Sequence, residues 1–303
     1  MRLAALLQAV LAVTSSPVRP DPVAALSARQ KAALVVVSGL PAPRGVAGVP
    51  VRPWDADEPR PARALVFVDQ EGGEVRAFPG RAPANPAAAY RSVRKAAAAG
   101  RRSGRGLRAE GVHVDLAPVL DLSSGPLGLR HFRSPRLGLA FARGLEEGGV
   151  AACPKHFPGL GSATVSTDEA PRVHARVLRP ELRAFRAAIR AHVPCVMVGH
   201  AFYGRFGGRA LTAPRAYRLL RRLGFEGAAI TDSLSIVRGP WTVRWARRAA
   251  RAGADLLLFT SPADARRAIR SLVPLARRGL LDEHVRRVLR LRRGLGLAGL
   301  SHW

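Results

Sequence analysis

A lysine and a histidine stand side by side where a short apolar run gives way to a loop of Pro and Gly. The run covers residues 149–152, and the segment that follows reads CPKHFPGLG over residues 153–161. Lys155 supplies a point charge with three donors, and His156 supplies a ring donor or acceptor. The pair can therefore hold a polyhydroxylated ligand or shift the pKa of a nearby carboxylate.

Other polar residues follow further apolar runs of the chain. They are Asp69, Asp121, Arg130, His200 and Asp232. Because the active site of an α/β barrel is built at the carboxyl ends of its strands, we expect these side chains to converge on one cleft. Several cations around two carboxylates keep those carboxylates ionised at neutral pH. An ionised carboxylate at the centre suits a nucleophile that attacks a sugar carbon.

The elements that position these residues are short apolar strands alternating with helices. We predict strands at 33–38, 64–69, 112–116, 150–155, 194–199, 227–231 and 254–259, and helices at 86–100, 181–192, 241–252, 262–278 and 282–295. Nearly pure apolar strands between helices indicate a parallel sheet covered on both faces. Seven or eight such units in 303 residues favour an α/β fold of the TIM-type (β/α)₈ barrel kind, as a single domain. The Pro-rich stretch 41–61 is predicted to be a surface loop.

Four stretches of the chain resemble the amino-terminal barrel of family 3 glycoside hydrolases, the class of bacterial β-N-acetylglucosaminidases. They are VDQEGG at 68–73, DLAPVLD at 115–121, KHFPG at 155–159, and the segment 224–235 with ITDSLS at its end. The resemblance runs from about Leu26 to Leu297. It implies a retaining exo-glycosidase that hydrolyses β-O-glycosidic bonds without a cofactor or metal. The small carbohydrate it implies as substrate is, by analogy, the amino sugar of a peptidoglycan fragment.

The resemblance also implies roles for particular residues. Asp232 matches the nucleophile. The sugar-binding positions fall on Asp69, Arg130, Lys155, His156 and His200. Asp121 is expected to cap a loop or to pair with an arginine.

The chain departs from the family in the loop that supplies the general acid. The β-N-acetylglucosaminidases carry an Asp-x-His pair there, and its His is the acid. Ser166 and Asp168 occupy the two positions here, so Asp168 is the predicted acid, with Glu169 beside it. A carboxyl at this point restores a scheme with two carboxylates if burial raises its pKa. The alternative is that Asp168 only caps a turn. The protein is then a catalytically impaired carbohydrate-binding barrel associated with the cell wall.

The formal net charge of +28 comes almost wholly from arginine, since only Lys31, Lys95 and Lys155 are lysines. The arginines are scattered over the predicted helices, and aromatic residues make up 6% of the chain, too few for a base-stacking platform. We therefore predict no nucleic-acid partner. Contact with an anionic cell surface remains open, and we expect a monomer.

The two cysteines, Cys153 and Cys195, both lie in predicted strands. No spacing typical of metal ligands surrounds them, so we predict buried, inert thiols and no metal site. His131, His174 and His192 are predicted to lie at the surface.

Residues 1–25 begin with one positive charge and a short apolar stretch. This pattern favours an export signal or an extension ahead of a domain at 26–303, the alternative being an amphipathic first helix. We therefore favour the cell envelope over the cytoplasm.

Overall fold

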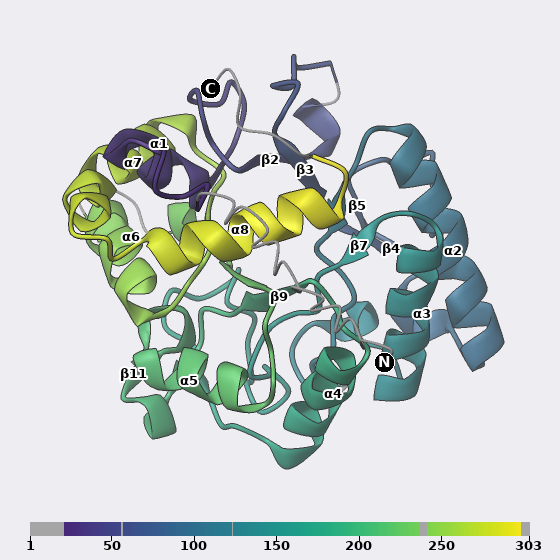
Figure 1. Ribbon diagram of the computed structural model, residues 1–303. Helices are drawn as coiled ribbons and strands as arrows, with labels where there is room; N and C mark the ends of the chain where they lie inside the picture. Colours follow the sequence, from purple (N-terminus) through teal and green to yellow (C-terminus); the bar gives the residue numbers. More distant parts are fainter. Residues whose placement is uncertain (1–20, 56, 123, 237–240, 298–303) are drawn as a thin grey trace, which may run out of the picture.

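The computed structural model describes residues 21–55, 57–122, 124–236 and 241–297. The core strands are β1 (Val36–Ser38), β2 (Gly48–Val51), β3 (Leu65–Val68), β6 (Val114–Asp115), β7 (Ala151–Ala152), β9 (Cys195–Val198), β12 (Ala228–Thr231) and β13 (Leu257–Phe259). The helices are α1 (Ala28–Leu34), α2 (Val93–Ala109), α3 (Pro135–Glu147), α4 (Arg179–Arg190), α5 (Pro214–Arg222), α6 (Trp241–Ala252), α7 (Pro262–Arg277) and α8 (Asp282–Gly294). From β3 onward the core strands alternate with α-helices, whereas no α-helix separates β1, β2 and β3 (Figure 1). None of the described helices is long and apolar enough to cross a membrane.

The core strands pair in parallel. One sheet has the order β13-β1-β2-β3-β6-β7, and β12 pairs with β9 in a second sheet. Two single parallel bridges link the sheets, one between Phe157 and Val198 and one between Ile230 and Leu256. The predicted α/β class with a mainly parallel sheet is therefore confirmed.

Small residues let α2 and α3 pack closely along one side of the molecule (Figure 1). A Cβ at Gly100 would lie 2.2 Å from the carbonyl oxygen of Phe141, and one at Gly144 would lie 2.2 Å from that of Ala97. Any larger residue at either glycine would push the helices apart. Ser92 begins α2 by accepting a hydrogen bond from the amide of Lys95 at 3.2 Å, as expected of an N-cap.

The prediction of a surface loop over 41–61 was wrong at its centre. Gly48–Val51 form β2, a buried strand between β1 and β3. Pro50 removes one amide donor and is typical of loops, so the local pattern concealed the strand. The first predicted strand also began too early, because α1 runs to Leu34 and β1 starts at Val36.

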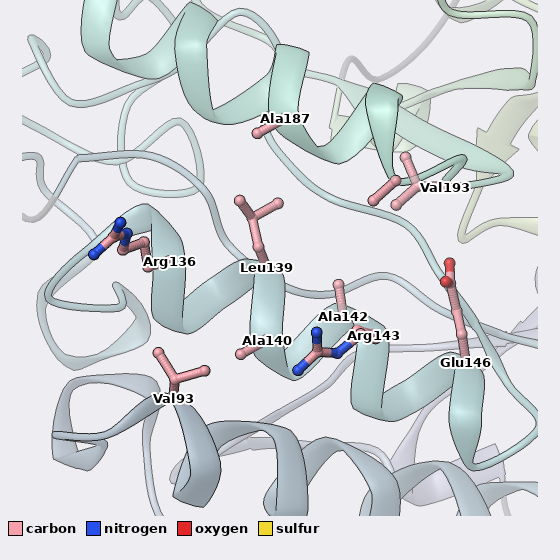
Figure 2. A pocket seen from close by; sticks show the side chains of 10 residues that line it. Val93, Arg136, Leu139, Ala140, Ala142, Arg143, Glu146, Ala187 and Val193 are labelled. Atoms are coloured by element: carbon pink, nitrogen blue, oxygen red, sulfur yellow. The ribbon is translucent and has the colours of Figure 1, made fainter.

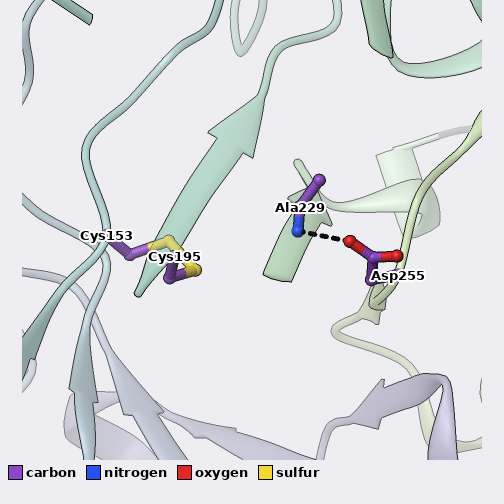
Figure 3. Close-up of a disulfide and its surroundings, with 4 residues drawn as sticks. All are labelled: Cys153, Cys195, Ala229 and Asp255. Atoms are coloured by element: carbon purple, nitrogen blue, oxygen red, sulfur yellow. Dashed lines mark hydrogen bonds between the residues drawn. A yellow bond between two sulfur atoms is a disulfide. The ribbon is translucent and has the colours of Figure 1, made fainter. Parts of the chain in front are cut away.

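The prediction of two free thiols was also wrong. Cys153 directly follows β7 and Cys195 begins β9, and their sulfurs form a disulfide with the Cα atoms 4.6 Å apart (Figure 3). Both residues are fully buried. The pairing depends on the neighbouring position of two strands whose cysteines lie 42 residues apart in sequence.

A buried carboxylate ties β12 to the segment before β13. Asp255 accepts a hydrogen bond from the amide of Ala229 at 2.8 Å (Figure 3). It also binds His284 at 2.9 Å and Arg287 at 3.3 Å, both on α8. Arg221 of α5 also pairs with it, and these four partners satisfy a charge that would otherwise be costly to bury.

Residues 1–20 of the predicted export segment lie outside the described residues. The described chain begins at Asp21, whose carboxylate binds Arg286 at 2.6 Å, and Val23 is fully buried. The prediction that His131 lies at the surface was wrong, since its side chain is buried and its Nδ1 lies 3.1 Å from the carbonyl oxygen of Gly128. His174 and His192 are exposed, as predicted.

Candidate active site

Most of the predicted site residues follow core strands at their carboxyl ends. Asp69 follows β3, Lys155 and His156 lie three and four residues beyond β7, His200 follows β9 by two residues, and Asp232 directly follows β12. Parallel strands bring their carboxyl ends to one edge of the sheet. At that edge, active-site side chains come from the strand ends and from the loops that follow them. The short apolar strands therefore place these groups on one side of the fold.

A buried ionic cluster lies at this edge. Lys155 binds the Glu71 carboxylate at 2.6 Å and also pairs with Asp69. Arg130 donates to both oxygens of Glu71, at 2.8 Å from Nε and 2.9 Å from Nη2. Glu71 and Lys155 are buried, whereas 47% of the Asp69 side chain is exposed. Asp69 is thus the carboxylate of this cluster that can reach a ligand.

The cluster keeps its members charged despite burial. Burial opposes the Glu71 charge, but Lys155 and Arg130 outweigh it and lower the pKa of Glu71 to about 2. Burial likewise opposes the Lys155 charge, yet Asp69 and Glu71 raise the pKa of that ammonium above its ordinary value. Opposite charges at hydrogen-bond distance favour the ionised forms.

Asp121 orients His156. Its Oδ2 lies 2.7 Å from His156 Nδ1, and its Oδ1 accepts hydrogen bonds from the amides of His156 at 3.2 Å and Leu160 at 2.8 Å. Burial opposes the imidazolium, but Asp121, with a further contribution from Asp232, raises the pKa of His156. Asp121 does cap a loop, as predicted, but its charged partner is His156 and not an arginine.

Asp232 and His200 meet at the ends of β12 and β9. Asp232 Oδ1 accepts a hydrogen bond from the amide of Ser233 at 2.7 Å, and His200 Nε2 lies 2.6 Å from the carbonyl oxygen of Ser233. Burial lowers the pKa of His200 against the opposing charge of Asp232. A neutral His200 ring therefore donates from Nε2 and holds the backbone next to Asp232.

Asp168 lies on the solvent side of this group. Its side chain is 64% exposed, and its Oδ2 is 3.7 Å from Arg130 Nη1. Its amide donates to Ser166 Oγ at 3.2 Å, so the segment turns back on itself at this point. The structure thus places Asp168 against one of the predicted sugar-binding cations.

Glu71 is a site residue that was not predicted from the sequence, although the motif VDQEGG contains it. Successive side chains of an extended segment alternate between its two faces. Asp69 and Glu71 are two apart, so that alternation could have placed both on the side of Lys155. The intervening Gln70 is buried and bonds the loop backbone at Phe78 instead.

A separate cavity of about 440 Å³ lies in the outer helical layer, away from the strand ends (Figure 2). Its lining comes from α2, α3, α4 and the residues after α4, and most of it is apolar. Glu146 lies on its wall, and burial raises the pKa of that carboxyl to about 7. None of the predicted site residues lines this cavity.

Known proteins share both the sequence pattern and the fold. The model of the glycosyl hydrolase family 3 N-terminal domain matches residues 51–291. A β-hexosaminidase of Methylococcus capsulatus is 35% identical over 227 residues, which cover 66% of this chain and 68% of that protein. A β-hexosaminidase of Thioalkalivibrio sulfidiphilus is 34% identical over 244 residues, covering 70% of each. The chain thus spans about two thirds of the length of these relatives.

Two solved structures have a similar fold. A family 3 β-N-acetylglucosaminidase from a Paenibacillus species superposes with a TM-score of 0.79 at 26% identity, over 92% of this chain and 65% of that one. A β-N-acetylhexosaminidase from Beutenbergia cavernae superposes with a TM-score of 0.78 at 26% identity, over 88% of this chain and 99% of that one. The predicted class of enzyme, a glycoside hydrolase, is confirmed. The chain belongs to glycosyl hydrolase family 3, of which it carries the N-terminal domain.

Proposed function

We propose that the chain is a retaining exo-glycosidase of the β-N-acetylhexosaminidase type. The names of its relatives support the type of activity. The observation that carries the proposal is the position of Asp232 directly after β12. There its carboxylate is close enough for its negative charge to favour the protonated forms of both His156 and His200. By analogy, the amino sugar of a peptidoglycan fragment is the first substrate to test.

Asp232 serves as the nucleophile in this scheme. Its Oδ1 is held by the amide of Ser233, so Oδ2 is the oxygen proposed to attack the anomeric carbon. The bond from that carbon to the leaving oxygen breaks, and the leaving oxygen takes a proton from the acid. Water, deprotonated by the same group acting as a base, then displaces Asp232 and releases the sugar with its original configuration.

The ionic cluster and the histidines bind the sugar. The half-exposed carboxylate of Asp69 accepts from sugar hydroxyls, while Lys155, Arg130 and His156 donate to sugar oxygens. The buried carboxylate of Glu71 holds Lys155 and Arg130 in place through ion pairs. His200 keeps the Asp232 segment in position through the Ser233 carbonyl group.

Asp168 is the proposed acid, and its surroundings are less suited to that task. A carboxylic acid that donates a proton at neutral pH is typically held in an apolar pocket, whereas the Asp168 side chain is mostly exposed and lies 3.7 Å from the Arg130 guanidinium. These two observations favour the second candidate function, a catalytically impaired carbohydrate-binding barrel. The two candidates differ in one property, the transfer of a glycosyl group to Asp232.

Fluorinated sugars with a good leaving group test this difference, because such a leaving group needs little help from an acid. The protein is incubated with N-acetylglucosaminyl and glucosyl probes and weighed intact. A mass gain of one glycosyl unit that maps to Asp232 supports the proposal. Asp168→Asn should still form the adduct, and Asp232→Asn should not. An adduct on another carboxylate contradicts the nucleophile, and no adduct with either probe supports the binding barrel.

We further propose that the eight core strands close into a (β/α)₈ barrel and that residues 26–303 act as one domain. The bridges between Phe157 and Val198 and between Ile230 and Leu256 support closure, because they continue the pairing across the gap between the two sheets. The alternation of one core strand with one helix from β3 to α7 is also typical of such barrels.

The protein is proposed to act as a monomer at an anionic cell surface. The neighbouring helices α5 and α6 carry no acidic residue. Their α5–α6 arginine face consists of Arg215, Arg218, Arg222, Arg244, Arg247, Arg248 and Arg251, which line two surface grooves. Within the described residues no ion pair is formed by these side chains.

Co-sedimentation with vesicles of anionic and of neutral phospholipid tests the surface contact. We expect binding to anionic vesicles only, and release as the salt concentration rises. Replacing Arg244 and Arg248 by Gln should weaken that binding more than replacing Arg94 and Arg105 of α2 by Gln. Equal effects of the two pairs would contradict a specific face.

A further inference from the structure

Arg209 lies where three segments around the candidate site meet. It belongs to β11 (Gly208–Arg209), which pairs with β10 (Phe202–Tyr203), and β10 pairs in turn with β8 (His174–Ala175). Its guanidinium donates to the carbonyl oxygen of His200 at 3.1 Å and to that of Pro171. Pro171 is three residues beyond Asp168. One side chain thus links the segment of the proposed acid to the end of the β9 strand.

Two aromatic rings lie close to the guanidinium of Arg209. Its central carbon lies 4.3 Å from the ring centroid of Phe202 and 4.7 Å from that of Trp245. Trp245 belongs to α6, the helix that follows Asp232 in the chain, and its ring lies 6.0 Å from that of His200. The guanidinium thus makes cation–π contacts with both rings while its N–H groups donate two hydrogen bonds, a combination for which the planar fork of arginine is suited and the compact ammonium of lysine is not.

The segment that carries Asp168 is anchored at both ends. Before Asp168, the amide of Gly161 donates to the buried carboxylate of Glu181 at 2.7 Å. After it, Arg209 holds Pro171, and the amide of Phe202 donates to Val173 at 2.8 Å. Asp168 itself is exposed, so its place relative to the reacting sugar depends on these anchors.

We propose that Arg209 is a positioning residue for general-acid catalysis by Asp168. This inference rests on the proposed function and adds a residue to it. A general acid must lie within hydrogen-bond reach of the leaving oxygen. Arg209 provides that placement by joining the Asp168 segment to His200, next to the backbone that presents Asp232. Within the described residues no carboxylate pairs with Arg209, so its donors serve the two backbone carbonyls.

The test compares β-N-acetylglucosaminides that differ only in the leaving group. A dinitrophenyl group departs without a proton, whereas a phenyl or alkyl group needs one. In Arg209→Met we expect kcat/KM for the phenyl substrate to fall by roughly tenfold to a hundredfold, below the range for complete loss of an acid. The value for the dinitrophenyl substrate should stay within about twofold of the original, because that substrate makes no use of the acid.

Four further variants make the result specific. Arg209→Lys keeps the charge but loses the planar fork of donors, so it should show the same selective loss, to a smaller degree. Asp168→Asn should show it in full, and adding Arg209→Met to Asp168→Asn should lower the rate no further, since both act on one step. Arg205→Met, on the same surface turn and exposed, is the matched control and should leave both substrates unaffected.

An equal loss on both substrates, no loss, or additive losses in the double variant would each overturn the role of Arg209. If Asp168→Asn shows no dependence on the leaving group while Asp232→Asn is inactive, the inference fails and the proposed nucleophile stands. If Asp232→Asn retains full activity, the proposed function itself fails. A protein that forms the Asp232 adduct but hydrolyses only the dinitrophenyl substrate contains no working acid, and this too overturns the inference.

Discussion

Glu71 accepts hydrogen bonds from Arg130 through both of its carboxylate oxygens, at 2.8 and 2.9 Å. The same carboxylate lies 2.6 Å from Lys155 Nζ, and both Glu71 and Lys155 are buried. One internal charge thereby holds two cations that the family resemblance assigns to sugar binding. The cations keep Glu71 ionised, and Glu71 fixes their geometry.

Replacement of Glu71 by Gln should weaken both stability and sugar binding. Loss of one partner of a buried ion pair commonly costs about 3–5 kcal/mol, because the remaining charge is left without compensation. Among the described residues, the half-exposed Asp69 would then be the one ion-pair partner left to Lys155. We expect a lower urea midpoint and a higher KM. The control is Glu74→Gln, which changes an exposed carboxylate three positions further along the chain. An unchanged midpoint would show that the pair contributes little.

Asp121→Asn should lower the pKa of His156. Burial opposes the imidazolium, and the Asp121 carboxylate at 2.7 Å is the principal group that favours it. Titration of the His156 ring by NMR checks this directly, with exposed His174 as the internal reference. In the original protein the raised pKa stabilises the fold at pH values below the ordinary pKa of 6.5, and this contribution is lost as the pH rises through the folded value. A His156 titration that does not move in the variant would contradict the pairing.

Glu181 should make the protein less stable as the pH rises from about 4.5 to about 7. Burial, together with the Asp121 charge, raises the pKa of Glu181 from 4.5 to about 7. In that interval the unfolded chain has already released the proton that the folded protein retains, so the free energy of unfolding falls with rising pH. The contribution is about 3 kcal/mol at most.

Glu181→Gln removes this titration while keeping an oxygen for the amides of Leu122 and Gly161, which now donate at 3.1 and 2.7 Å. The difference in unfolding free energy between variant and original should therefore change with pH across the interval. Urea unfolding at several pH values measures it, with exposed Glu226→Gln as control. A difference that stays constant with pH would contradict a proton held by folded Glu181.

The disulfide between Cys153 and Cys195 should stabilise the fold substantially. It closes a loop with a sequence separation of 42, for which the chain-entropy model gives about 4 kcal/mol. We expect reduction, or replacement of both cysteines by Ala, to lower the urea midpoint. Alkylation of the unfolded, non-reduced protein should label no thiol. Two labelled cysteines per chain would contradict the disulfide.

The positions of the site residues along the chain could be predicted from the sequence alone. Asp69 and Asp232 each directly follow an apolar run, and Lys155 and His156 come just after one. The direction of the chain then determines that they lie at the carboxyl ends of strands. The α/β class followed in the same way, because the alternation of apolar strands with helices is a local pattern. The family motifs added the roles, which no local pattern contains.

Only the tertiary structure decided which groups meet. β2 is a strand despite Pro50, because it is buried between β1 and β3. Cys153 forms a disulfide with Cys195, and Glu71 forms an ion pair with Arg130. Arg209 donates a hydrogen bond to Pro171, which lies 38 residues earlier in the sequence. The sequence alone determined which side chains stand at the strand ends. A short apolar run predicts a buried strand from adjacent residues, and the polar residue after the run marks the end of that strand. The contacts between those side chains depend on the order in which distant strands pair, and that order arises only when the chain packs.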